Sequence, residues 1–95
     1  MSVANGVEFD WDAANISHLK RHRVTTLEFE EVMTGDPVYV AYQGSDGEER
    51  YKVLGPTRSG RMLLAVWTPR DGRIRAITAY SASRAQQKLY WEGLK

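Results

Sequence analysis

The sequence contains two histidines, His18 and His22, and His22 is the natural candidate to take or give a proton near neutral pH. They stand four residues apart in a stretch with helical periodicity, so both side chains reach the same helix face one turn apart. His22 is the first candidate for proton transfer, and Lys20 beside it is the second. The alternative for His22 is a histidine that only stabilises the end of a helix through the helix dipole.

The same spacing would let both imidazoles bind one metal ion from a helix face, as in zinc hydrolases. However, the sequence has no cysteine, no glutamate between the two histidines and no obvious third ligand. We therefore expect no metal and no other cofactor. A metal-dependent hydrolase built on His18 and His22 remains a third interpretation.

Arginines form the second group of candidates, because guanidinium groups bind phosphate oxygens and stabilise charge that develops on phosphorus. Arg61 and Arg75 belong to two different expected strands, and we expect them to converge on one patch near the end of the first helix. Five further basic residues are expected to bind RNA around this patch: Arg50, Arg70, Arg73, Arg84 and Lys88. The alternative is that each of them is a charge that protects a sheet edge from aggregation.

Tyrosines are interleaved with these basic residues. Aromatic rings among cationic side chains are typical of surfaces that stack on the bases of single-stranded RNA. The tyrosines that could stack in this way are Tyr39, Tyr42, Tyr51 and Tyr80. Trp67 lies in a run of apolar residues, which favours a place in the hydrophobic core instead.

The charged residues are distributed unevenly along the 95-residue chain. Residues 1–48 hold three basic and nine acidic side chains, whereas residues 49–95 hold ten basic and three acidic ones. This split suggests a basic working surface and an acidic opposite face, unless the two halves pair with each other in the fold. A chain of this length is expected to form a single domain, residues 1–95. Neither a run of ~20 apolar residues nor a signal peptide is recognisable, so a cytoplasmic protein without membrane contact is expected.

Three short strands in the second half would carry the arginines. Residues 61–68 are apolar at nearly every position, as in a strand covered on both faces, and residues 50–54 and 73–79 alternate apolar with basic side chains. The segments between them each begin with proline and end with glycine, which predicts tight turns. An antiparallel sheet with 61–68 in its middle follows, and residues 38–42 add a β-branched and aromatic strand.

Capping signals predict two helices before this sheet. Asp12 can accept hydrogen bonds from the free N–H groups of a first helix over residues 13–21, which would bury Ile16 and Leu19. Thr25 and Glu28 fit the reciprocal capping box of a second helix.

A third helix is expected after the sheet. Ser81 or Ser83 can cap it, and it would run to about Gly93 with Leu89 on its inner face. Residues 1–6 are expected to fray. The fold class is therefore α+β: a small antiparallel sheet with two N-terminal helices and a C-terminal helix, which together leave one face of the sheet free.

Several short motifs follow one another in a recognisable order. They are Phe9-Asp10-Trp11-Asp12, His22-Arg23-Val24-Thr25, Gly35-Asp36-Pro37 and Arg75-Ala76-Ile77-Thr78-Ala79. This series resembles the BrnT family, the small ribonuclease toxins of bacterial type II toxin–antitoxin pairs, which are similar in fold to RelE toxins. The resemblance implies a RelE-like α+β fold, RNA as the substrate, and a cognate antitoxin that neutralises the toxin and binds operator DNA.

Four positions depart from the pattern of that family. Members commonly carry Lys-His-Gly where this chain has Arg21-His22-Arg23, an arginine where Tyr80 stands, and a glutamate where Gln86 stands. The family arginine would be a phosphate ligand. Without it, the interpretations are an attenuated copy, or a Tyr80 that acts as a secondary acid or stacks on a base.

The leading hypothesis is an endoribonuclease that needs no metal. The 2′-OH of the RNA attacks the adjacent phosphate, His22 or Lys20 assists the proton transfer, and Arg61 and Arg75 stabilise the charge that develops on phosphorus. The alternative is a catalytically silent module that keeps the scaffold and binds a partner protein or RNA. A homodimer is compatible with either hypothesis.

Overall fold

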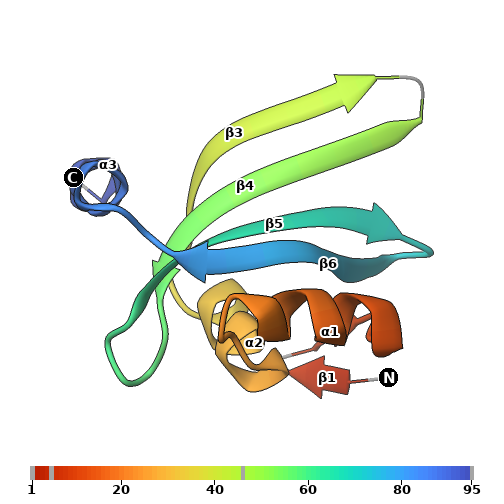
Figure 1. Cartoon of the computed structure of the whole chain (residues 1–95). Helices are drawn as coiled ribbons and strands as arrows, with labels where there is room; N and C mark the ends of the chain where they lie inside the picture. The colour runs from red at the N-terminus through yellow and green to blue at the C-terminus, as the bar shows by residue number, and fades with distance from the viewer. Residues whose placement is uncertain (1, 5, 46, 95) are drawn as a thin grey trace.

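The computed structural model describes residues 2–4, 6–45 and 47–94 of the chain. In chain order, its elements are β1 (Ser2–Ala4), β2 (Val7–Phe9), α1 (Ala13–Arg21), α2 (Thr26–Thr34), β3 (Val38–Ser45), β4 (Glu48–Pro56), β5 (Met62–Arg70), β6 (Arg73–Ser81) and α3 (Arg84–Gly93) (Figure 1). The predicted α+β class is confirmed. None of the described helices has the length and apolarity that crossing a bilayer requires.

One sheet contains the six strands of the described residues, in the order β1-β2-β6-β5-β4-β3. Strands β3 to β6 form the predicted antiparallel meander, and β5, buried at residues 62–66, lies inside it. Strand β2 departs from the expected antiparallel arrangement, because it pairs in parallel with β6 through Phe9 and Ile74. The expected fraying was wrong for Ser2–Ala4, a three-residue edge strand paired with β2, while positions 1 and 5 lie outside the described residues.

Each helix begins with a reciprocal capping box. The N-cap side chain accepts from the backbone N–H three residues later, and the side chain at that later position accepts from the N-cap N–H. The three pairs are Asp12 with Asn15, Thr25 with Glu28, and Ser83 with Gln86. Asn15 also donates from Nδ2 to the Asp10 carbonyl oxygen at 2.8 Å, so its buried amide is hydrogen-bonded through both its oxygen and its nitrogen.

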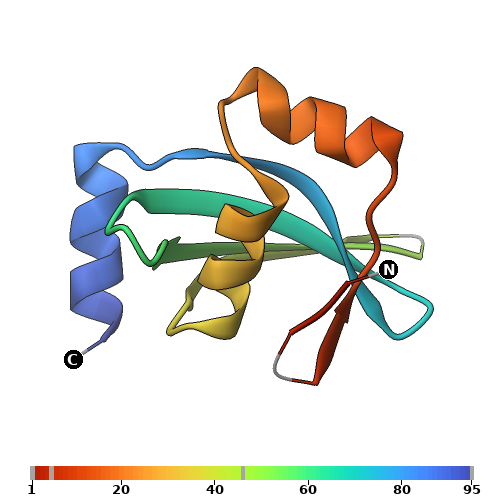
Figure 2. The same ribbon diagram turned by 90° about the horizontal axis from the view of Figure 1, so that it is seen from below.

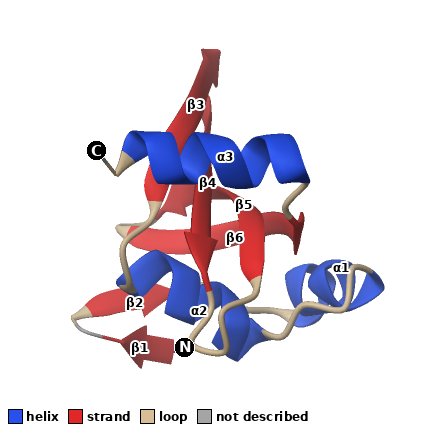
Figure 3. Ribbon diagram, turned by 90° about the vertical axis from the view of Figure 1, so that its left-hand side faces the viewer, coloured by secondary structure: helices blue, strands red, loops and turns tan. Residues whose placement is uncertain are grey.

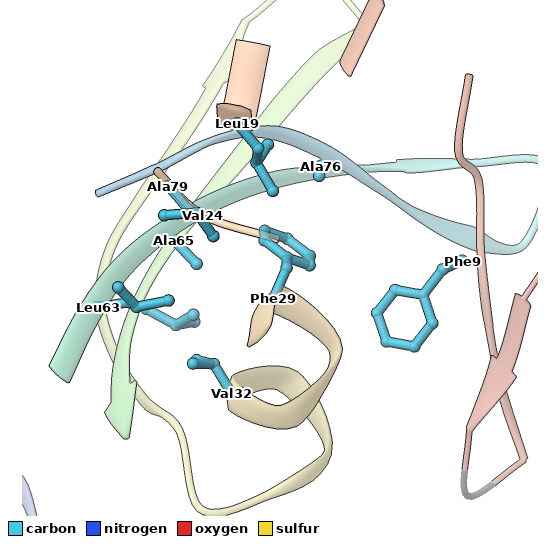
Figure 4. Packing of buried hydrophobic residues seen from close by; sticks show 10 residues of the cluster. Phe9, Leu19, Val24, Phe29, Val32, Leu63, Ala65, Ala76 and Ala79 are labelled. Atoms are coloured by element: carbon cyan, nitrogen blue, oxygen red, sulfur yellow. The ribbon is translucent and has the colours of Figure 1, made fainter. Parts of the chain in front are cut away.

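Helices α1 and α2 cover one face of the sheet (Figure 2). The main core lies between them and the strands, and its largest side chains include the fully buried Phe9, Phe29 and Leu19 (Figure 4). The Phe9 and Phe29 rings meet edge to face with centroids 6.3 Å apart. Ile16, expected inside, is instead 39% exposed, because α1 buries Asn15 and Leu19 against the sheet.

Helix α3 crosses one end of the opposite face, so this face is not free as expected (Figure 3). Tyr90 makes the contact: its ring packs with Leu54 and Leu64, and its hydroxyl donates to the Asp36 carbonyl oxygen at 3.0 Å. Leu89, expected on the inner side of the helix, is 51% exposed. Most of the surface of α3 is therefore open.

Candidate active site

Helix α1 runs beside β6 (Figure 1), and its His18 and the following His22 lie along that strand. The imidazole centroids of His18 and His22 are 5.7 Å apart, and the His22 and Tyr80 ring centroids are 6.0 Å apart. These three residues are termed the ring row. Because Tyr80 belongs to β6, the ring row bridges the helix and the strand.

The end of α1 fixes the position of the His22 ring. His22 is the C-cap, its backbone N–H donates to the Leu19 carbonyl oxygen at 3.0 Å, and Arg23 after it has a left-handed φ of 57°. That turn directs the buried Val24 into the core. The spacing of four residues puts His18 one turn earlier, where it is half-buried, while His22 is exposed.

Arg61 braces this turn from the residue before β5. Its Nη1 donates to the Arg23 carbonyl oxygen at 2.7 Å, and its Nη2 donates to the His22 carbonyl oxygen at 3.4 Å. The same guanidinium pairs with Glu28 at 3.2 Å and donates from Nε and Nη2 to Ser81 Oγ at 3.2 and 3.0 Å. All three nitrogens of Arg61 therefore face protein acceptors. The arginine holds the backbone around His22 and does not present a free guanidinium to a phosphate.

Arg75 lies at the other end of α1, beside the helix start. Its Nη2 is 2.8 Å from Asp12 Oδ2, and its Nη1 is 3.6 Å from Asp10 Oδ2. Among the described residues, the buried Nη1 has no hydrogen-bond acceptor. The backbone N–H of Asn15, and then Arg75, lower the pKa of Asp12 from its ordinary value of 3.8. Asp12 is therefore charged at neutral pH and competes with any phosphate for Arg75.

The two arginines therefore do not converge, and that expectation was wrong. Asp12 and His22, which they contact, are separated by the length of α1, roughly 15 Å at 1.5 Å per residue. The reason is the register of the β5–β6 hairpin. Arg61 stands at the end of the hairpin where β6 finishes, whereas Arg75 stands near the end where β6 begins.

A shallow pocket of about 240 Å³ opens between α1 and β6. It is lined by Ala14, Asn15, His18, Arg75, Ala76 and Ile77. His18 belongs to both the pocket and the ring row, so the pocket brings an imidazole and a guanidinium from two elements together. This junction of helix and strand is the part of the molecule where a phosphodiester could meet both kinds of group.

A larger hollow, of about 320 Å³, lies at the C-terminal end of α2. Glu31 and Asp36 line it together with Arg58, and the carbonyl end of the helix dipole adds negative potential there. None of the predicted site residues is among the described residues that line it. We assign the site to the smaller pocket because its chemistry suits a polyanion better.

Three predicted basic residues lie away from the ring row. Lys20 stands two positions after His18, which is about 200° around α1, so these two side chains leave the helix in nearly opposite directions. Arg84 and Lys88 are exposed and one turn apart on α3. They form a basic strip on that helix, separate from the pocket.

The other three predicted RNA-binding arginines each lie beside a carboxylate. The pairs are Arg50 with Glu48 at 3.3 Å, Arg70 with Asp10 at 3.9 Å, and Arg73 with Asp71 at 3.8 Å. Arg70, Arg73 and Arg75 share the hairpin end of β5 and β6, whereas Arg50 stands at the start of β4. The acidic and basic halves of the sequence thus partly neutralise each other in the fold.

In the part of the chain that the structure describes, no group of three or more His, Asp or Glu side chains is placed to hold a metal ion. His18 and His22 therefore have no third protein ligand among these residues. The interpretation as a metal-dependent hydrolase gains no support from this geometry.

Sequence reasoning missed the part that His18 plays and the partners of Arg61. From the sequence, His18 is singled out only as a metal ligand, although its spacing from His22 already puts two imidazoles on one helix face. Glu28 and Ser81 are recognisable only as capping candidates. No local signal shows that they bind a guanidinium 33 and 20 residues away.

The fold and the site define a small α+β protein that carries imidazole, phenol and guanidinium groups along one helix–strand junction. Residues 11–86 match the family model described as the ribonuclease toxin BrnT of type II toxin–antitoxin systems, so the chain belongs to the BrnT family. The resemblance in the sequence motifs is thereby confirmed. Membership indicates a ribonuclease toxin with an RNA target and an antitoxin partner. A comparison with curated proteins gives no match.

Proposed function

We propose that the chain cleaves RNA through attack of a 2′-OH on the adjacent phosphate, without a metal ion. A bond forms between the 2′-oxygen and phosphorus, and the bond from phosphorus to the 5′-oxygen of the next nucleotide breaks. The products are a 2′,3′-cyclic phosphate and a free 5′-OH. One proton leaves the 2′-OH and one joins the departing oxygen, so the reaction needs a base and an acid near one phosphate.

The ring row is the single observation that carries this proposal. His22 is exposed and lies between His18 and Tyr80, with centroid distances of 5.7 and 6.0 Å. In the proposal, His22 accepts the proton of the 2′-OH and the Tyr80 hydroxyl donates a proton to the 5′-oxygen. Separate groups on a helix and a strand can lie on two sides of the phosphate, as the reaction requires.

Cationic groups have two distinct roles in this proposal. Arg75, with His18 in the same pocket, binds a phosphate oxygen of the RNA nearer the start of α1, after displacing Asp12. Arg61 is a positioning residue, because its bonds to the carbonyl oxygens of His22 and Arg23 orient the catalytic ring. The basic strip of Arg84 and Lys88 is proposed to contact RNA beyond the cleaved bond, and Lys20 takes no part in the chemistry.

The test is cleavage of single-stranded RNA in EDTA by the purified chain, freed from its antitoxin. We expect cleavage that leaves 2′,3′-cyclic phosphate ends. His22→Ala should lower the rate by about 100-fold or more, the usual contribution of a general base, and Tyr80→Phe should also lower it. Arg21→Ala, which changes an exposed neighbour on the same helix, is the matched control and should leave the rate within about twofold.

Two results would remove the mechanism. The first is cleavage that stops when EDTA is added, since a required metal would then supply the chemistry. The second is a His22→Ala variant that cleaves as fast as the Arg21→Ala control. A Lys20→Ala variant that loses activity while His22→Ala keeps it would transfer the role of the base to Lys20.

One observation favours a second candidate, a catalytically silent module that binds RNA or a partner protein. Arg61 and Arg75, the arginines predicted to bind phosphate, both engage protein acceptors, and Tyr80 stands where the family carries an arginine. This candidate predicts RNA binding that weakens as salt rises, with no cleavage at any salt concentration. Binding and cleavage of the same labelled RNA, measured side by side, separate the two candidates.

A further inference from the structure

The exposed apolar side chains of this protein are concentrated on two neighbouring elements. Eight large apolar side chains are exposed among the described residues. Six of them come from β3, from α3 and from the C-cap after α3: Tyr39, Val40, Tyr42, Leu89, Trp91 and Leu94. The two elements contact each other, since the backbone of Gly93 lies against the Val38 side chain. Concentration of this kind marks interaction surfaces in proteins.

Strand β3 is also an open edge of the sheet. It pairs with β4 on one side and, within the described part of the chain, with no strand on the other. Natural proteins protect such edges with charged residues, with proline or by keeping them short. Strand β3 has eight residues and no charged side chain. After a register shift between Tyr39 and Ala41, its pairing with β4 is regular up to Ser45.

We infer that β3 pairs antiparallel with β3 of a second copy of this chain, with Gln43 at the two-fold axis. In this register, Tyr42 of one copy lies opposite Gly44 of the other. The Tyr42 ring is already fixed, because its hydroxyl donates to Glu49 Oε1 at 3.1 Å and the ring leans over Gly44 of its own copy. Two identical uncharged edges also meet without repulsion between like charges.

The location of β3 favours a second copy over the antitoxin as its occupant. Strands β6 and β3 are three places apart in the sheet, about 14 Å at 4.8 Å per step, and Figure 1 shows α1 beside β6 and away from β3. A chain added to β3 leaves the ring row and its pocket uncovered. An antitoxin that blocks access to RNA has to cover α1 and β6 instead. This choice of occupant rests on the proposed site, whereas the open β3 edge itself is independent of the cleavage mechanism.

The available surface fits a contact between two copies. The exposed side chains that β3 itself brings to this contact are Tyr39, Val40 and Tyr42, and the backbone of the paired edges adds to their area. A standard interface buries about 800 Å² per partner. The expected dimer is therefore at the small end of stable interfaces and dissociates on dilution. An isologous contact of this type closes after two copies.

Light scattering during size-exclusion chromatography of the isolated full chain tests the inference over a range of concentrations. We expect the mass of two chains at high concentration and of one chain at low concentration. Gln43→Lys places two like charges at the axis and should weaken dimerisation about tenfold or more. Ser59→Lys adds the same charge at an exposed loop position far along the chain, and it should dimerise like the unchanged chain.

Cysteine cross-linking provides a second test that does not depend on the lysine variant folding. The chain has no cysteine, so a disulfide in Gln43→Cys can only join two copies. Opposite residues in antiparallel strands have Cα atoms about 4.5–5.5 Å apart, which a disulfide can span. We expect oxidation to link Gln43→Cys rapidly and Ser59→Cys slowly. Three results would each overturn the inference. The first is an equal rate of disulfide formation in Gln43→Cys and Ser59→Cys, and the second is a chain that stays monomeric at every concentration. The third is assembly through β3 only when the antitoxin is present.

Discussion

Replacing Arg61 by alanine separates a structural role of this arginine from a role in binding phosphate. The guanidinium joins four parts of the fold: the segment before β5, the turn after α1, the first turn of α2 and the end of β6. If these contacts are its main role, the substitution should lower the free energy of unfolding even in the absence of RNA. If Arg61 serves mainly to bind phosphate, its removal should leave stability unchanged.

The expected loss follows from the contacts. Arg61 bonds to a turn carbonyl, a carboxylate and a hydroxyl, and bonds of this type to a charged group contribute about 1.5 kcal/mol each at the low end. The full loss, about 4.5 kcal/mol for the three bonds, is not expected, because the Arg61 and Glu28 side chains are 29% and 22% exposed and water can replace part of the guanidinium. We expect a loss of about 2 kcal/mol. For a domain of this size, that lowers the midpoint of thermal unfolding by about 10 °C.

Thermal unfolding followed by circular dichroism measures this loss directly. Arg58→Ala removes the same charge from an exposed position in the neighbouring loop, and it should melt within about 2 °C of the unchanged chain. Arg61→Lys keeps the charge but cannot reach the same acceptors with one ammonium group, so it should recover only part of the loss. If Arg61→Ala melts like Arg58→Ala but no longer cleaves RNA, the assignment of Arg61 as a positioning residue is refuted.

Three further predictions test the turn, the ion pair and the core. Arg23→Gly should raise the free energy of unfolding in urea by about 0.5–1 kcal/mol, because glycine adopts a φ of 57° without side-chain strain. The backbone N–H of Thr25, and then Arg61, lower the pKa of Glu28 from its ordinary value of 4.5, so the charged carboxylate stabilises the fold above that pH and the contribution is lost as the pH falls through the lowered value. Unfolding at pH 7 should therefore show Glu28→Gln to be less stable than the unchanged chain, and the difference should shrink at pH 3; a constant difference would contradict the assignment. Phe29→Ala should cost about 3–5 kcal/mol in urea unfolding because the ring is fully buried, whereas Leu27→Ala, at a 61% exposed position two residues earlier, should cost little; equal losses would contradict the described core.

The helices and strands could be predicted because their signals are local. Asp12 and Thr25 mark helix starts through bonds to residues three positions away, and the prolines and glycines of the hairpins mark turns over four or five residues. The family resemblance rested on equally short motifs. For the same reason, the spacing of His18 and His22 was enough to place both residues on one face of a helix.

The parts that could not be predicted depend on contacts between distant segments. The parallel pairing of Phe9 with Ile74 joins two ends of the chain, and no local pattern encodes it. The orientation of α3 depends on where Tyr90 meets the sheet, and that contact leaves Leu89 outside. The separation of Arg61 from Arg75 depends on the register of the β5–β6 hairpin. The alternation of apolar and basic residues along each strand does not determine that register.

The three-residue strand β1 limits how far these molecules can assemble. At that border of the sheet, too few backbone groups are available to template the addition of another chain. Two molecules joined through β3 would leave only their β1 edges open, so growth by addition of further strands would stop at the pair.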